Sequence, residues 1–115
     1  MINEHLSIEK KNIPNITLYT LTGRLDENSF YMLKEEIGND EPKDNIILNL
    51  AHLKYISSSG IRALFEIKNK LESNGKKLIL TEASENIIRI FSLLELWKSF
   101  IHYEKENEAV RSFSS

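Results

Sequence analysis

Three consecutive serines followed by a glycine, Ser57 to Gly60, are the residues of this chain whose types and spacing could carry chemistry. They lie between an apolar stretch and a segment with the residue spacing of an amphipathic helix. The free backbone N–H groups and the positive dipole end of a helix N-terminus favour an anion. A phosphate placed on one of these hydroxyls would be held by the same geometry. The run therefore predicts a phosphoryl switch and not an active site.

The serine run also has a plainer explanation. Serine is a preferred helix N-cap residue, and Gly60 would allow close packing or an unusual turn. A single phosphate adds about −1.5 to −2 charges at neutral pH, whereas the formal net charge of the whole chain is −2. Modification would thus nearly double the net charge at one place. Lys54 and Arg62 flank the run, either as partners of the phosphate or as ordinary solvated charges, and the residues alone leave all three serines open as acceptors.

A catalytic serine would need a general base, and the histidines of the chain are His5, His52 and His102. No motif brings any of them to the serine run, and the nucleophile elbow G-x-S-x-G is absent. The glycines form neither of the phosphate-binding patterns, and there is no cysteine and no metal-ligand spacing of histidines. The sequence therefore predicts no catalytic residue, no metal and no cofactor. A small enzyme with Ser58 as nucleophile remains the minor alternative.

Regular elements on both sides must position the serine run. The segment Asn45–Leu50 carries the near-continuous apolar run that is typical of a central strand in an α/β sheet. A helix is predicted from Gly60 until Asn74 and Gly75 end it. The short strand Leu78–Thr81 follows. Strand, helix and strand with brief links indicate a right-handed crossover and parallel pairing.

The other elements complete a mixed sheet with helices packed on it. An N-terminal hairpin is expected, with Gly23 breaking its second strand. Asp26, Asn28 or Ser29 would cap the following helix, and Ser84 would cap the third. The predicted elements are strands near 6–8 and 16–22, a helix ending near Ile37, a helix from 84 to about 93 with Ile87, Ile88, Phe91 and Leu94 facing inward, a strand at 100–103 and a helix at 104–113.

The whole chain, residues 1–115, is predicted to form a single domain. Hydrophobic residues make up 41% and charged residues 28%, a balance typical of a soluble globular protein. A formal net charge of −2 creates no strong attraction to nucleic acid or to an anionic membrane. The chain has no signal-peptide pattern, no apolar run approaching the roughly 20 residues of a membrane helix and no cysteine, so a cytoplasmic location is expected.

Four stretches of the sequence resemble a known family over nearly the whole chain. They are Leu21–Asp26, Ile47–Leu50, Leu53–Arg62 and Asn86–Phe91. Together they resemble a STAS domain of the anti-sigma factor antagonist type. The serine-glycine block after a buried strand is the more specific element. The Gly-x-Leu-Asp element within the first stretch lies at the expected distance upstream.

The resemblance implies an α/β fold, with a mixed sheet of four to five strands flanked by about four helices, and a non-enzymatic switch protein. In that family the unmodified form binds an anti-sigma factor, itself an ATP-dependent serine kinase, and so releases a sigma factor for transcription. The kinase phosphorylates the switch protein, binding is lost, and a phosphatase restores it. By motif match the phosphorylated residue here is Ser58. The partner interface would include Gly23, Arg24, Leu25, Asp26, Ser57, Ser59, Gly60, Ile61 and Arg62.

The chain departs from the family pattern at two positions. Many members have an aspartate where Ser57 stands, so a negative charge beside the acceptor is missing here. The family often has a glycine near the end of the third helix, where this chain has Glu95, and the difference bears on how that helix ends. The alternative within the same fold is a STAS domain that is not phosphorylated and serves as a scaffold or interaction module in a signalling or lipid-transport complex.

Overall fold

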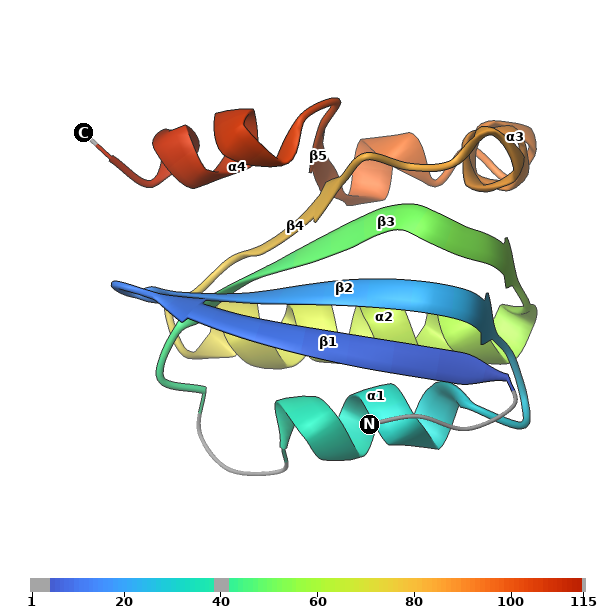
Figure 1. Ribbon diagram of the computed structural model, residues 1–115, viewed down its shortest axis with the longest axis horizontal. Helices are drawn as coiled ribbons and strands as arrows, with labels where there is room; N and C mark the ends of the chain where they lie inside the picture. Colours follow the sequence, from blue (N-terminus) through green and yellow to red (C-terminus); the bar gives the residue numbers. More distant parts are fainter. Residues whose placement is uncertain (1–4, 39–41, 115) are drawn as a thin grey trace.

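The computed structural model describes residues 5–38 and 42–114 and contains one mixed β-sheet. Its strands lie in chain order across the sheet, β1-β2-β3-β4-β5. β1 runs antiparallel to β2, and the later neighbours pair in parallel. The expected α/β fold with a mixed sheet is therefore confirmed (Figure 1). The strands are β1 (Leu6–Ile13), β2 (Ile16–Leu25), β3 (Asn45–Ile56), β4 (Leu78–Thr81) and β5 (Ile101–Tyr103).

Helices cover both faces of the sheet. In Figure 1, α1 and α2 lie on one side of the sheet and α4 on the other. Side chains alternate along each strand, so the two faces bury two separate clusters. The larger cluster joins Leu48 and Leu80 to Leu33, Leu64 and Phe91 from α1, α2 and α3, and the smaller joins Ile47 and Ile79 to Ala109 of α4. The helices are α1 (Phe30–Ile37), α2 (Ser58–Ser73), α3 (Glu85–Leu93) and α4 (Glu106–Ser112), with a 3₁₀ turn η1 (Trp97–Ser99) before β5.

The N-terminal hairpin is longer than its sequence pattern predicts. Gly23 does not end the second strand, because β2 continues to Leu25. At Gly23 the φ angle is 108°, which glycine adopts readily, and its backbone still pairs with Leu6 of β1 and Leu53 of β3. The prediction of a strand break at Gly23 is therefore wrong. The three extra residues, 23–25, bring β2 to the level of the serine run.

β3 also continues beyond its predicted end, to Ile56 instead of Leu50. The apolar run predicts only the part that lies between two strands, because β4 pairs with residues 46–49 alone. Farther along, β2 is the only strand among the described residues that pairs with β3, and His52 and Lys54 are exposed. The strand thereby loses the all-apolar pattern that marks its first half. Its extension leads directly into the serine run.

The serines expected at helix starts do not all cap their helices. Ser29 and Ser84 stand at the N-cap positions of α1 and α3, but neither side chain makes a capping hydrogen bond. The Ser84 hydroxyl instead donates to the carbonyl oxygen of Leu53 at 2.5 Å, and the Ser29 hydroxyl donates to that of Arg24 at 2.7 Å. Both hydroxyls therefore fasten a helix start to the end of a strand.

The inward face of α3 is narrower than predicted. Ile87 and Phe91 are fully buried, as expected. Ile88 and Leu94 are 48% and 57% exposed, so their assignment to the core is wrong. α3 presents Ile87 and Phe91 to the larger cluster, with the partly buried Ile90 packed against it, whereas Ile88 and Leu93 are exposed.

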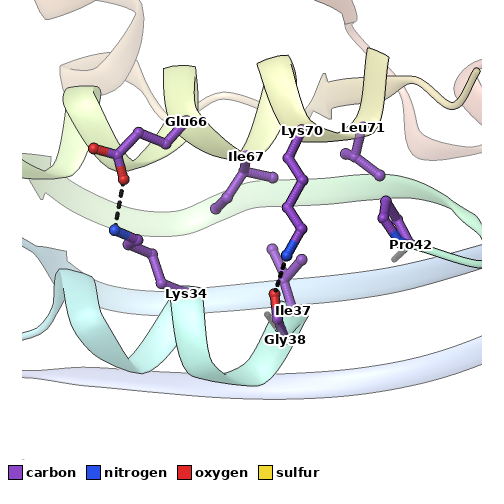
Figure 2. Close-up of a pocket in the computed structure, with 8 residues that line it drawn as sticks. All are labelled: Lys34, Ile37, Gly38, Pro42, Glu66, Ile67, Lys70 and Leu71. Carbon is purple, nitrogen blue, oxygen red and sulfur yellow. Dashed lines mark hydrogen bonds and ion pairs between the residues drawn. The ribbon is translucent and has the colours of Figure 1, made fainter. Parts of the chain in front are cut away.

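A cavity of about 160 Å³ lies between α1 and α2 (Figure 2). Beside it, Lys34 forms an ion pair of 2.5 Å with Glu66, and the ammonium group of Lys70 donates to the carbonyl oxygen of Gly38 at 3.2 Å. These contacts hold the two helices together. Gly38 and Pro42, which flank residues 39–41 outside the described part of the chain, line this cavity. No residue of the serine run lines it.

Candidate functional site

Three segments meet at the N-terminus of α2: the end of β2, the end of β3 and the serine run. Leu25 pairs with Ile56, and the N–H of Ser57 donates a hydrogen bond of 3.0 Å to the carbonyl oxygen of Leu25. We call residues 23–26 and 57–62 together the serine corner. The sequence alone does not establish that these two segments approach each other, whereas the structure joins them directly.

Ser58 provides the exposed hydroxyl of the serine corner. α2 begins at Ser58, two residues before the predicted start at Gly60, because Ser57 takes the extended N-cap conformation. The Ser57 side-chain oxygen accepts from the N–H of Gly60 at 3.4 Å and is therefore engaged in capping. Ser59 is half-buried and Ser58 is exposed. Within the described residues the Ser58 hydroxyl has no hydrogen-bond partner, so it is the hydroxyl that an attacking or docking group can reach.

Two glycines make the close backbone contacts of the corner possible. A Cβ atom on Gly60 would lie 2.4 Å from the carbonyl oxygen of Leu25 and 2.8 Å from a side-chain carbon of Ile56. A Cβ atom on Gly23 would lie 2.3 Å from the carbonyl oxygen of His5. That same carbonyl accepts a hydrogen bond of 2.7 Å from the N–H of Arg24. Any side chain at either position would push the segments of the corner apart.

Arg24 places a positive charge beside Tyr55, two residues before the serine run. Its guanidinium carbon lies 4.4 Å from the ring centroid of Tyr55, its partner in the pairing of β2 with β3. Its Nε lies 3.3 Å from an oxygen of Asp26. Contact with an aromatic face and with a carboxylate both hold a guanidinium in one orientation. The Arg24 side chain remains 52% exposed, so its charge is fixed in place and still reaches solvent.

Asp26 is a buried carboxylate with a full set of hydrogen bonds. It accepts from the N–H of Asn28 at 3.0 Å and lies 3.3 Å from the hydroxyl of Ser29. Burial by itself raises the pKa of Asp26. The hydrogen bonds from Asn28, Arg24 and Ser29 and the charge of His5 outweigh burial, so the pKa lies below its ordinary value of 3.8. Asp26 is therefore ionised at neutral pH and anchors the loop that carries Arg24.

The side chains of the serine corner divide into an exposed and a buried set. Arg24, Ser58 and Arg62 are exposed, and Arg62 lies one helical turn after Ser58 on the same side of α2. The half-buried residues are Gly23, Ser57, Ser59 and Ile61, and the buried ones are Leu25, Asp26 and Gly60. A docking protein would touch the exposed side chains first. The buried side chains determine the shape of the serine corner.

No histidine forms a nucleophile-base pair with a serine of the corner in the described part of the chain. His102 lies on β5 with its ring centroid 4.3 Å from that of Trp97. His52 is exposed on β3, several residues before the serine run. His5 meets the corner through its backbone carbonyl and through its charge near Asp26. A serine hydrolase needs such a pair.

The described residues also lack a grouping that could bind a metal ion. Among them, no three or more His, Cys, Asp or Glu side chains lie close enough together to hold one. Nor is any helix in residues 5–38 and 42–114 both long and apolar enough to cross a membrane.

The fold and the corner define a class of small α/β domains in which two adjacent parallel strands frame an exposed serine at a helix start. This chain belongs to the STAS domain family, whose family model matches residues 7–109. The family expected from the sequence is thereby confirmed.

Solved structures share the fold over nearly the full length of both chains. The protein TM1081 of Thermotoga maritima gives a TM-score of 0.86 at 18% identity, covering 94% of this chain and 95% of that one. An anti-sigma factor antagonist from Mycobacterium paratuberculosis gives 0.77 at 19% identity, covering 96% and 95%. The anti-sigma factor antagonist SpoIIAA in its unphosphorylated form gives 0.73 at 20% identity, covering 92% and 95%. At such identities the likeness establishes the fold.

Proposed function

We propose that this protein is an anti-sigma factor antagonist, a non-enzymatic protein that sequesters an anti-sigma factor serine kinase and so releases a sigma factor. The observation that carries the proposal is the exposed Ser58 hydroxyl at the first position of α2, without a partner among the described residues. Membership of the STAS family supports it, as does the fold shared with two anti-sigma factor antagonists. SpoIIAA has also been solved in its phosphorylated form.

The proposed modification is a phosphoryl transfer from ATP to Ser58. The Ser58 oxygen forms a bond to the γ-phosphorus, the bond from that phosphorus to the β–γ bridging oxygen breaks, and ADP leaves. The hydroxyl proton passes to a base of the kinase. A phosphatase reverses the change with water, which yields inorganic phosphate and the free hydroxyl. This chain supplies the acceptor alone, and the kinase and the phosphatase are the partners that supply catalysis.

Charge at Ser58 would control binding. Ser57, Ser58, Ser59 and Gly60 present a small and neutral helix start that a partner can approach closely. A phosphate of about −1.5 to −2 charges would have to be desolvated on docking unless the partner supplied cations. A loss of about 3 kcal/mol in binding free energy lowers affinity by roughly two orders of magnitude.

Each residue of the corner has a stated part in this proposal. Arg24 and Arg62 contact the partner directly, together with the half-buried Ser59 and Ile61. Gly23, Leu25, Asp26, Ser57 and Gly60 set the positions of these contacts through the backbone approach and hydrogen bonds described above. The proposal places the protein in the cytoplasm, where the kinase and sigma factor act.

The test is a pull-down from source cells with wild type, Ser58→Ala and Ser58→Asp. We expect Ser58→Ala to retain the partner kinase with ATP present, and Ser58→Asp to lose it. Incubation of wild type with the captured kinase and ATP should add one phosphate to the tryptic peptide 55–62, with fragment ions assigning it to Ser58. Ser57→Ala and Ser59→Ala are the matched controls, because their peptides keep the acceptor.

Two outcomes contradict the proposal. If both Ser58 variants bind as wild type does under active kinase, charge at this position does not control binding. If no phosphate appears on the peptide although a partner is captured, the corner is an unmodified contact surface, and the scaffold function takes its place.

A further inference from the structure

A further concave surface lies at the carboxyl ends of β4 and β5, and no residue of the serine corner lines it. It is a cleft of about 700 Å³ between α3 and η1 on one side and α4 on the other. Ligand sites in proteins commonly measure about 300–1,000 Å³. The floor is formed by Leu80 and Thr81, which are both buried. The cleft therefore has the size and the firm base of a small-molecule site.

The topology explains why a cleft opens at this place. From β4 the chain passes to α3, whose Phe91 belongs to the larger cluster, and from β5 it passes to α4, whose Ala109 belongs to the cluster on the opposite face. Two adjacent parallel strands thus send their connections to opposite faces of the sheet, as the two clusters indicate. In open α/β sheets, ligands bind in the crevice outside the carboxyl ends of strands that diverge in this way.

Aromatic and apolar side chains line one part of the cleft. Trp97, His102, Tyr103 and Ile88 all contribute to the lining. The rings of Trp97 and His102 lie 4.3 Å apart between centroids, and Trp97 also packs at 4.7 Å on the buried Phe91. The buried Phe91 ring therefore holds the Trp97 ring in position. Ile88 is 48% exposed, and a ligand in the cleft would cover part of this surface.

Carboxylates dominate the charge of the same cleft. Glu82, Glu104 and Glu108 line it, against the single cation Lys105. One Glu82 oxygen accepts from the N–H of Glu106 at 2.9 Å, and one Glu108 oxygen accepts from the N–H of Lys105 at 3.0 Å. These bonds orient two carboxylates while their second oxygens have no hydrogen-bond partner among the described residues. An aromatic wall beside carboxylates is the environment that favours a desolvated organic cation.

We propose that this cleft binds a small organic cation, an amine whose ammonium group meets the carboxylates and whose flat apolar body lies against Trp97 and Tyr103. The neutral or anionic analogue of the same shape would lose the charge interaction and leave the carboxylates without a counter-ion. The site is independent of the serine corner, because the two share no residue.

The test uses two indole probes of the same shape and opposite charge, tryptamine and indole-3-propionate. Each is titrated into the ¹⁵N-labelled full chain at low salt. We expect saturable shifts of the Trp97 indole N–H and of amides in 82–83 and 102–108 with tryptamine, with a Kd at or below about 1 mM. Indole-3-propionate should bind at least about tenfold more weakly. The double variant Glu104→Gln/Glu108→Gln should weaken tryptamine about threefold to tenfold, because screened surface charges contribute modestly.

Glu85→Gln is the matched control, since Glu85 is an exposed acid of α3 outside the lining. Ser58→Asp should bind tryptamine as wild type does, which separates this site from the proposed phosphoryl switch. Equal affinity for the two probes overturns the proposal. Absence of saturable shifts at the lining residues overturns it too, as does an equal loss of affinity in Glu85→Gln.

Discussion

The N–H of Ser57 and the carbonyl oxygen of Leu25 are joined by a hydrogen bond of 3.0 Å, and through it the serine run is tied to the end of β2. Gly60 lies over the same carbonyl, at a distance that excludes a side chain. The position of Ser58 therefore depends on two backbone contacts made by its neighbours. The same pairing of β2 with β3 sets the charge of Arg24 beside Tyr55.

Gly60→Ala should destabilise the domain, although alanine favours helices more than glycine does. Helix propensity alone would stabilise by up to about 1 kcal/mol. The new Cβ atom would lie 2.4 Å from the carbonyl of Leu25, and such overpacking typically destabilises by about 1–3 kcal/mol. We expect a net loss of free energy of unfolding in urea titrations. Ser59→Ala, one residue earlier, is the control and should change stability by less than about 0.5 kcal/mol. A more stable Gly60→Ala would show that the corner is looser than described.

Arg24→Ala should weaken partner binding with little effect on stability, if the proposed function holds. The Arg24 side chain is 52% exposed, and exposed ion pairs contribute roughly 0–1 kcal/mol to stability. Removal of a charged group from an interface usually weakens binding by more than that. We expect at least about a tenfold loss of affinity by titration calorimetry with the captured kinase. Lys98→Ala, an exposed cation of η1, should bind as wild type does. An equal loss of affinity in the two variants would show that Arg24 does not contact the partner.

Asp26→Asn should lower stability at neutral pH and flatten the acid limb of the stability curve. The folded-state pKa of Asp26 lies below 3.8, so the unfolded chain binds more protons as acid is added. The contribution of this carboxylate is thus fully present well above pH 3.8 and is lost as the pH falls through the folded pKa. We expect a loss of about 1–3 kcal/mol at pH 7, typical for hydrogen bonds to a charged group. Urea titrations between pH 7 and pH 2 measure both effects, and an unchanged acid slope would contradict the assignment.

Glu95→Gly should stabilise the domain slightly or leave it unchanged. Glu95 ends α3 with a φ of 54°, in the left-handed region that glycine adopts without strain. The following N–H, of Leu96, donates to the carbonyl of Phe91 at 2.8 Å, which closes the helix end. Glycine would relieve about 1 kcal/mol of backbone strain in the folded state. Its greater flexibility in the unfolded chain destabilises the fold and offsets part of this gain. Glu35→Gly, at an exposed position inside α1, is the control and should destabilise by about 1 kcal/mol. Equal thermal shifts in both variants would be inconsistent with this explanation.

The sequence predicts the parts of the fold where local pattern and tertiary position agree. The apolar run at residues 46–48 lies between two strands, and it correctly indicates a central parallel strand. His52 and Lys54 lie on the same strand beyond the reach of β4, and their polar side chains conceal that the strand continues beside β2. Gly23 misleads for a related reason: glycine usually interrupts a strand, but here it allows the carbonyl of His5 to approach.

The sequence indicates which segments form the candidate site, but it does not indicate how the fold brings them together. The serine-glycine block and the segment 23–26 are recognisable from their sequence, whereas the hydrogen bond from Ser57 to Leu25 depends on strand register. Tyr55 carries no signal that it supports Arg24. The cleft beyond β4 and β5 is formed by residues from separate elements, so periodicity does not reveal it. Of the two positions at which the chain departs from the family pattern, Glu95 at the end of α3 is the one that marks an unusual backbone conformation, with a positive φ.

Each strand of the described sheet after β1 pairs with the strand before it in the chain. The strands and the helix start that hold Ser58 all precede β4 and β5, so a ribosome completes them first. Ser58, the proposed acceptor, is therefore synthesised before the C-terminal third of the domain.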